Sequence, residues 1–218
     1  MISFVIPDDF FSDFVLLVGN ARFENLDLIK GLRDKASRIV GVDGGAAVLK
    51  KYGIIPHLIV GDFDSVDINT LEFFKVKGTE ILHIPDQNNN DLEKALRTIV
   101  KETSNLILVG FLGSRFDHTL ATLFVLKKYI KKHRFFLVGD AMEVYLLKAG
   151  NYKISTEKGQ IFSIFAFNRA EGVVLKGFKY NLDSVRLLPG SLGLSNTSLG
   201  REVEIRFSRG TLIVIKNL

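Results

Sequence analysis

The feature that most constrains the fold is an alternation of short aliphatic runs with longer amphipathic stretches between residues 14 and 147. The runs have the length of buried strands, and the stretches carry apolar residues three and four positions apart, as helices with one buried face do. This pattern predicts an α/β domain with a mainly parallel sheet. The predicted strands are residues 14–18, 38–42, 58–60, 80–84, 106–109, 135–138 and 143–147, and the predicted helices are residues 26–36, 46–52, 68–75, 91–101 and 118–131.

The character of the sequence changes near residue 150. Beyond this point, short β-rich runs are separated by Gly, Asn and Ser and show no helical period. These runs are residues 161–167, 172–175, 203–207 and 212–216. Because period and composition change together, we predict an α/β domain over residues 1–149 and an all-β sandwich over residues 150–218.

The composition excludes several classes of protein. The chain has no Cys, so disulfides, thiolate metal sites and a cysteine nucleophile are ruled out, and any metal must be held by oxygen or imidazole. No apolar run approaches the roughly 20 residues of a membrane helix, and the start of the chain lacks the features of a secretory signal, so we expect a cytoplasmic protein. The net charge of +5 is spread along the chain. It favours attraction of a nucleotide, and we expect no nucleic-acid partner.

Gly, Asp, Asn and Arg gather directly after five of the predicted strands. In an open α/β sheet, ligands bind outside the carboxyl ends of the strands, so these residues are the candidates for a site. They fall at residues 19–20, 43–45, 61–65, 86–91 and 113–118.

Asp62 and Asp64 alternate in a tight segment, with Phe63 turned away between them. Two carboxylates can therefore approach one point, which suits Mg²⁺, a cation that prefers oxygen ligands. A solvated turn is the alternative, because Asp is also favoured in turns. Taken alone, the pair does not decide between the two interpretations.

Asp91 opens a predicted helix and follows the polar run Asp86-Gln87-Asn88-Asn89-Asn90. It could serve as an N-cap, but the preceding polar residues favour a metal ligand that also starts the helix. Asp43-Gly44-Gly45 likewise opens a helix. The two glycines and the free backbone N–H groups would let a nucleotide come close, although an ordinary turn is the alternative.

Arg115 and Asp117 lie on a glycine-containing turn that enters a helix. The guanidinium could bind phosphate oxygens next to a carboxylate, and a structural Arg–Asp pair is the alternative. His118 follows them, and we expect it to be structural, because phosphoryl transfer depends mainly on positioning and charge stabilisation.

Taken in order, these motifs resemble those of the thiamine pyrophosphokinase family. The β half contributes two further matches, Gly177-Phe178-Lys179-Tyr180-Asn181-Leu182 and Gly193-Leu194-Ser195-Asn196. The resemblance spans residues 43 to 196. It implies a transferase that makes thiamine diphosphate from ATP and thiamine, with Mg²⁺, an N-terminal α/β domain that binds ATP and metal, a C-terminal β-sandwich that binds thiamine, and a homodimer.

The resemblance also assigns roles to individual residues. Asp62, Asp64 and Asp91 are expected to hold Mg²⁺, with Asp64 and Asp91 taking part in catalysis. Arg115 and Asp117 are expected at the reaction centre, where Asp117 could accept the hydroxyl proton. The residues expected to bind ATP or thiamine are Asp43, Gly44, Gly45, Gln87, Arg115, Ser195 and Asn196.

The chain departs from the family pattern at several positions. Asn88 stands where many members have Asp, Thr122 where Asn is usual, and Ser114 where Gly is common, and no Trp is available to pack against thiamine. These departures leave a non-catalytic thiamine or nucleotide sensor open. A metal-dependent nucleotide-sugar transferase is a second alternative, but it explains neither the Arg-x-Asp-His turn nor the β half.

Overall fold

The computed structural model describes residues 13–99, 105–113 and 115–218, so Ser114 and the end of the helix predicted at 91–101 lie outside the described residues. Its contacts divide the chain into two compact units. The α/β unit holds Asp13–His133 and Leu137–Asp140, and the β unit holds Arg134–Phe136 and Ala141–Leu218. Among the described residues, no helix combines the length and the apolar character that a membrane span requires.

The α/β unit contains a parallel sheet with strand order β5-β1-β2-β3-β4. The chain moves outward from β1 to β4 and then returns through α4 to β5 on the other side of β1. The direction of winding therefore reverses between β1 and β5. The strands of this sheet are β1 (Val15–Val18), β2 (Arg38–Val42), β3 (Leu58–Gly61), β4 (Glu80–His83) and β5 (Asn105–Val109), and the helices are α1 (Leu26–Arg33), α2 (Gly45–Lys51), α3 (Ile68–Val76), α4 (Asp91–Ile99) and α5 (Phe116–Tyr129). The next strand, β6 (Arg134–Val138), is divided between the two units, with Arg134–Phe136 in the β unit.

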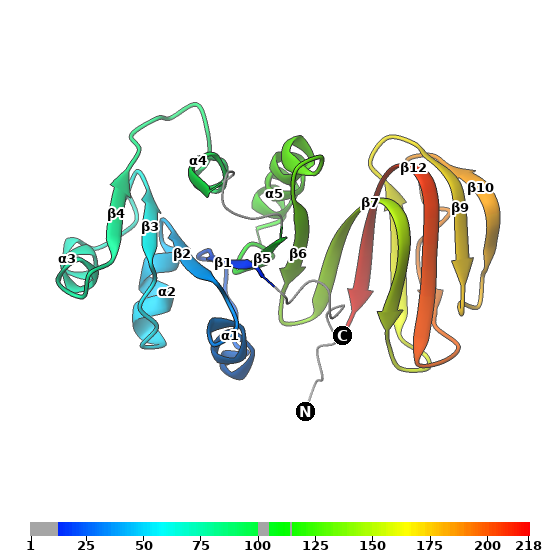
Figure 1. Cartoon of the computed structure of the whole chain (residues 1–218), viewed down its shortest axis with the longest axis horizontal. Coiled ribbons are helices and arrows are strands. Elements are labelled where there is room, and N and C mark those ends of the chain that lie inside the picture. Colours follow the sequence, from blue (N-terminus) through cyan, green and yellow to red (C-terminus); the bar gives the residue numbers. More distant parts are fainter. Residues whose placement is uncertain (1–12, 100–104, 114) are drawn as a thin grey trace. The chain divides into compact units, whose positions relative to one another are not determined.

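Burial explains why the central runs form strands. Every residue of β1, β3 and β5 is buried, as expected for parallel strands that are covered on both faces. Figure 1 shows α1 and α2 on one side of the sheet and α4 and α5 on the other. Side-chain caps fix where helices begin: Asn25 accepts from the N–H of Leu28 at 3.1 Å at the start of α1.

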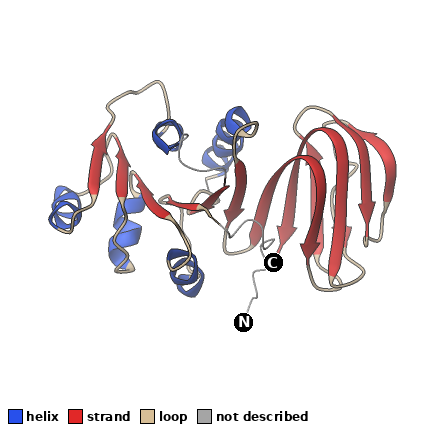
Figure 2. Ribbon diagram, in the orientation of Figure 1, coloured by secondary structure: helices blue, strands red, loops and turns tan. Residues whose placement is uncertain are grey.

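The β unit is antiparallel and is built around two long strands, β7 (Met142–Ser155) and β12 (Glu202–Asn217), which pair along most of their length. The first part of β12 also pairs with β9 (Ala170–Lys176), which pairs with β10 (Leu182–Leu187). The last part of β12 pairs instead with β8 (Ile161–Ala166), which pairs with β11 (Asn196–Thr197). The pairings of β7 and β12 are continuous, with β9 and β10 beside the first part of β12 and β8 and β11 beside its last part. Figure 2 shows this part of the chain as strands joined by loops.

The two parts of β12 meet at a register shift between Phe207 and Thr211. Gly210 there has φ of +102°, and a Cβ on it would lie 2.1 Å from the carbonyl oxygen of Arg169. The irregularity marks where the second neighbour of β12 changes from β9 to β8.

The predicted fold class is confirmed, but several strands differ from the prediction. Residues 143–147, assigned to the α/β half, form the start of β7 and pair with β12. Residues 203–207 and 212–216 belong to one strand, and β10 and β11 were not predicted. β7 runs through residues 149 and 150 without a break. The domain boundary that the sequence analysis placed there stays a prediction.

Candidate active site

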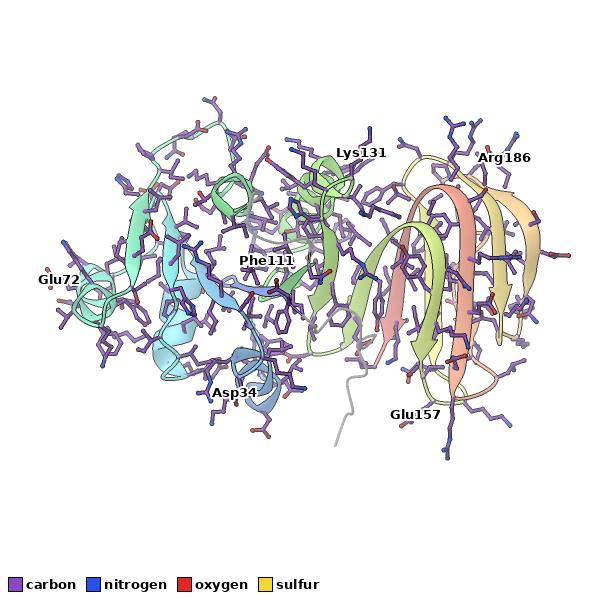
Figure 3. All side chains as sticks on the ribbon, viewed as in Figure 1. Asp34, Glu72, Phe111, Lys131, Glu157 and Arg186 are labelled. Atoms are coloured by element: carbon purple, nitrogen blue, oxygen red, sulfur yellow. The ribbon has the colours of Figure 1, made fainter. Side chains whose placement is uncertain are left out.

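A cavity of about 700 Å³ opens in the α/β unit at the carboxyl ends of the strands. Residues that follow β1, β2, β3 and β5 line it, together with the first residues of α4 and α5. It therefore lies where the winding of the sheet reverses, which is where open α/β sheets bind ligands. Phe111, just beyond the end of β5, is one of its lining residues (Figure 3).

The three carboxylates of Asp43, Asp62 and Asp91 come together in this region. One oxygen from each lies within 4.8 Å of the others, although the residues follow β2 and β3 and begin α4. Asp43 adopts the left-handed φ of +45°, a conformation that Asp tolerates better than most residues. The parallel sheet thus gathers side chains that are far apart in the sequence.

Asp43 has one engaged oxygen and one unengaged oxygen. Its Oδ2 accepts from the hydroxyl group of Ser65. Its Oδ1 is buried and has no hydrogen-bond partner among the described residues. A buried carboxylate oxygen without a partner is costly, so it is a place where a cation or a water is expected.

Asp91 is the first residue of α4, yet it is not the residue whose side chain caps the helix. The side chain of Asn90 accepts from the N–H of Glu93 at 2.9 Å and performs that function. The carboxylate of Asp91 is therefore available for other contacts. This supports the interpretation of Asp91 as a ligand that also starts the helix.

Lys94 is a buried residue of the site that the sequence-based prediction did not include. Its side chain is 2% exposed, and its Nζ lies 2.7 Å from Asp62 Oδ2 and 2.9 Å from Asp91 Oδ1. One signal for it in the sequence is its position three residues after Asp91 on the same helix, where the two side chains share a face.

Lys94 and Asp62 shift each other's pKa. The hydrogen bond from Lys94 lowers the pKa of Asp62 against the opposing effect of burial. Burial lowers the pKa of Lys94, but its hydrogen bonds to Asp62 and Asp91 outweigh that effect and the pKa is raised. Counted formally, the three Asp side chains and the one Lys side chain give the group an excess of two negative charges.

Asp64 and Gln87 lie differently from the residues of this group. Asp64 is exposed and outside the group of three, and its backbone N–H donates to Asp62 Oδ1 at 3.3 Å. Gln87 is exposed in a segment organised by Asp86, which accepts from the backbone N–H of Asn88 at 2.9 Å. Both residues stay predictions.

Gly44 and Gly45 occupy the start of α2, as expected. A Cβ on Gly45 would lie 1.8 Å from the carbonyl oxygen of Val18 at the end of β1. Only glycine permits this contact, which brings α2 and the preceding Asp43 against the sheet.

Arg115 and Asp117 pair with each other at the edge of the cavity. Arg115 Nη2 lies 2.5 Å from Asp117 Oδ2, and both side chains are exposed. The hydrogen bond from Arg115 lowers the pKa of Asp117, so this carboxylate is ionised at neutral pH. Thr122, in α5, is buried and also lines the cavity.

Ser195 and Asn196 belong to the β unit. Ser195 is exposed and adopts a left-handed φ of +55°. Asn196 is buried: its Oδ1 accepts from the N–H of Tyr180 at 3.0 Å, and its Nδ2 donates to the carbonyl oxygen of the same residue at 2.7 Å. The amide of Asn196 therefore fixes the backbone of Tyr180, whose side chain is exposed.

The donor set suits a hard divalent cation. All three converging groups are carboxylates, the ligands that Mg²⁺ and similar ions prefer, and one of their oxygens is buried without a partner among the described residues. The excess of two negative charges is what a divalent cation neutralises. These residues therefore fit a metal ion.

Two family models match the chain. Residues 29–137 match "Thiamin pyrophosphokinase, catalytic domain", and residues 151–212 match "Thiamin pyrophosphokinase, vitamin B1 binding domain". Among curated relatives, a thiamine pyrophosphokinase of Bacillus subtilis is 28% identical over 196 residues, covering 87% of this chain and 91% of the relative. Thiamin pyrophosphokinase 1 of Caenorhabditis elegans is 27% identical over 203 residues, covering 86% and 82%.

Solved structures agree with these matches. The thiamine pyrophosphokinase from Bacillus subtilis has a TM-score of 0.81 at 25% identity, covering 94% of this chain and 98% of that one. The enzyme from Candida albicans has a TM-score of 0.79 at 20% identity, covering 99% and 96%, and supports the fold. The models together span both units, and the chain belongs to the thiamin pyrophosphokinase family.

Proposed function

We propose that the chain transfers the pyrophosphoryl group of ATP to the hydroxyl group of thiamine, forming thiamine diphosphate and releasing AMP. The observation that carries this proposal is the group of Asp43, Asp62 and Asp91 beside a cavity at the switch point of the sheet. An acidic site of this kind suits a metal-bound polyphosphate. Family membership supplies the identity of the substrates.

The proposed metal is Mg²⁺, held by Asp43, Asp62 and Asp91, with Asp64 on the adjoining exposed loop as a further predicted ligand. When bound, Mg²⁺ neutralises charge on the phosphate oxygens. Gly44 and Gly45 leave room for the nucleotide beside α2, and Gln87 stays a predicted nucleotide contact.

The cavity residues of the α5 turn complete the proposed mechanism. Arg115 binds phosphate oxygens and stabilises the charge that develops on them. Asp117, ionised beside Arg115, accepts the proton of the thiamine hydroxyl as its oxygen attacks the β-phosphorus. The bond from the β-phosphorus to the oxygen of the α-phosphate breaks, and AMP leaves with that oxygen.

Thiamine recognition is proposed for the β unit of a homodimer. Ser195 is exposed there, and Asn196 holds the backbone of Tyr180, whose ring is 61% exposed. In a chain without Trp, this ring is a candidate to pack against thiamine.

The first test is to incubate the protein with ATP, Mg²⁺ and thiamine and to identify both products. We expect AMP and thiamine diphosphate in equal amounts, because the β-phosphorus is attacked. ADP with thiamine monophosphate would mean single phosphoryl transfer instead. Binding of both substrates without turnover would favour the sensor, the alternative that the substitutions at Asn88 and Thr122 keep open.

The dimer can be tested on the exposed leucines of the β unit. Leu192 and Leu194 are 72% and 55% exposed, close in sequence to exposed Leu188 and Leu199. Exposed apolar side chains that adjoin on a surface commonly mark an interface, and we propose that these leucines do so. We expect the double variant Leu192→Ser, Leu194→Ser to be monomeric by size-exclusion chromatography with light scattering, whereas Ile68→Ser, at an exposed position on α3, should leave the dimer intact. A dimeric double variant would contradict this placement.

A further inference from the structure

The acidic group consists of the carboxylates of Asp43, Asp62 and Asp91. Each of these carboxylates has one oxygen that accepts a hydrogen bond from a side chain of the protein. The hydroxyl group of Ser65 donates to Asp43 Oδ2. Lys94 Nζ donates to Asp62 Oδ2 at 2.7 Å and to Asp91 Oδ1 at 2.9 Å. Two donor residues thus hold three carboxylates that come from different parts of the chain.

The second oxygens are differently placed. Asp43 Oδ1 is buried and unpartnered among the described residues, and Asp62 Oδ1 receives the N–H of Asp64 in a long hydrogen bond of 3.3 Å. When a hydrogen bond fixes one oxygen of a carboxylate, the orientation of the carboxylate is fixed as well, and its other oxygen can bind a ligand.

We infer that Ser65 and Lys94 are positioning residues, which orient the three carboxylates so that their remaining oxygens bind one divalent cation. This inference rests on the proposed metal site and extends it to two residues that need not touch the metal.

The physical reason is the repulsion among like charges. Three carboxylates with oxygens within 4.8 Å of one another repel strongly, the more so where they are partly shielded from water. Lys94, 2% exposed, bridges Asp62 after β3 and Asp91 on α4 and offsets part of this repulsion. Without Lys94, the carboxylates of Asp62 and Asp91 lose the contact that keeps them close before the cation binds. The affinity of the site for the cation then falls.

Ser65 provides the cleaner test, because its exposed side chain can be changed with little risk to folding. Removal of an oriented partner of a metal ligand typically weakens metal binding by about 10- to 100-fold. We expect Ser65→Ala to bind Mn²⁺ about 10-fold more weakly than the unchanged protein, measured by calorimetry without ATP or thiamine. Ser65→Thr keeps the hydroxyl group and is expected to restore the affinity.

Lys94→Met removes the ammonium group and keeps much of the side-chain volume. We expect its affinity for Mn²⁺ to fall by about 10- to 100-fold, although the site becomes formally more negative. The matched control is Lys128→Met: Lys128 Nζ lies 2.9 Å from the buried carboxylate of Glu93 on the same helix α4. This control also removes an ammonium from a buried carboxylate, and it should leave Mn²⁺ affinity unchanged.

The outcomes distinguish a failure of the proposed metal site from a failure of the positioning roles of Ser65 and Lys94. If the unchanged protein binds no Mn²⁺, the proposed metal site fails. If it binds Mn²⁺ and folded Lys94→Met binds as tightly or more tightly, positioning by Lys94 is overturned. Should Lys94→Met not fold, Ser65→Ala and Ser65→Thr still decide the inference: equal affinity in both overturns it, and a loss in the first restored in the second supports it.

Discussion

Replacing Asp62 with Asn is expected to lower kcat for thiamine diphosphate formation by about 10²- to 10³-fold, the scale for losing one charge-stabilising group in an active site. The substitution keeps the shape of the side chain but removes a negative charge from the group with Asp43 and Asp91. Lys94 keeps Asp91 as a partner, so folding should be retained. The release of AMP measures kcat, and calorimetry measures thiamine binding, which should change little.

The matched control is Asp67→Asn. Asp67 lies five residues further along, is exposed, and caps α3 by accepting from the N–H of Asn69. Asn is an equally good cap, so this variant removes the same charge and should retain full activity. Asp64→Asn should be measured beside these two variants, because Asp64 stays a predicted metal ligand. An Asp62→Asn variant with more than a tenth of normal kcat would remove Asp62 from the metal site.

Replacing Gly45 with Ala is expected to have the largest effect on stability. The added Cβ would lie 1.8 Å from the carbonyl oxygen of Val18, and neither backbone can move without displacing β1 or α2. Overpacking of this kind costs roughly 1 to 3 kcal/mol, and rigid backbone places the expected loss in the free energy of unfolding at about 3 kcal/mol. Denaturation in urea, followed by circular dichroism, measures the change.

Gly31→Ala is the control. Gly31 lies within α1, and nothing stands within 4 Å of the place its Cβ would occupy. Ala is the better helix former by about 1 kcal/mol, so this variant should be as stable as the unchanged protein or slightly more so. If the free energy of unfolding of Gly45→Ala also stayed within 1 kcal/mol of that of the unchanged protein, the close contact between β1 and α2 would not be required for stability.

Topology explains why carboxylates from distant parts of the sequence lie near one another. Once the aliphatic runs are taken as parallel strands, their carboxyl ends meet at one edge, which brings Asp62 and Asp91 together. The prediction gave Asp64 as the third metal ligand and assigned Asp43 to the nucleotide, whereas the group of three carboxylates contains Asp43 and leaves out Asp64. Lys94 and Ser65 depend on packing between elements. A lysine on a helix ordinarily faces water, and its burial follows from how α4 lies against the sheet.

The β unit was harder to predict, for a different reason. Residues 143–147 form an aliphatic run of the same kind as those of the parallel sheet. The sequence near this run does not indicate which strand it will pair with. Ser208, Arg209 and Gly210 resemble a turn between two strands, yet they form an irregularity within one strand. β10 alternates poorly, and only one of its six residues is buried.

The pairing of β12 with three other strands has a consequence for how the β unit unfolds. Opening either part of β12 breaks hydrogen bonds to β7, so the strands beside the first part of β12 and those beside its last part depend on the same pair of long strands. We therefore expect the strands of the β unit to unfold together in one cooperative step.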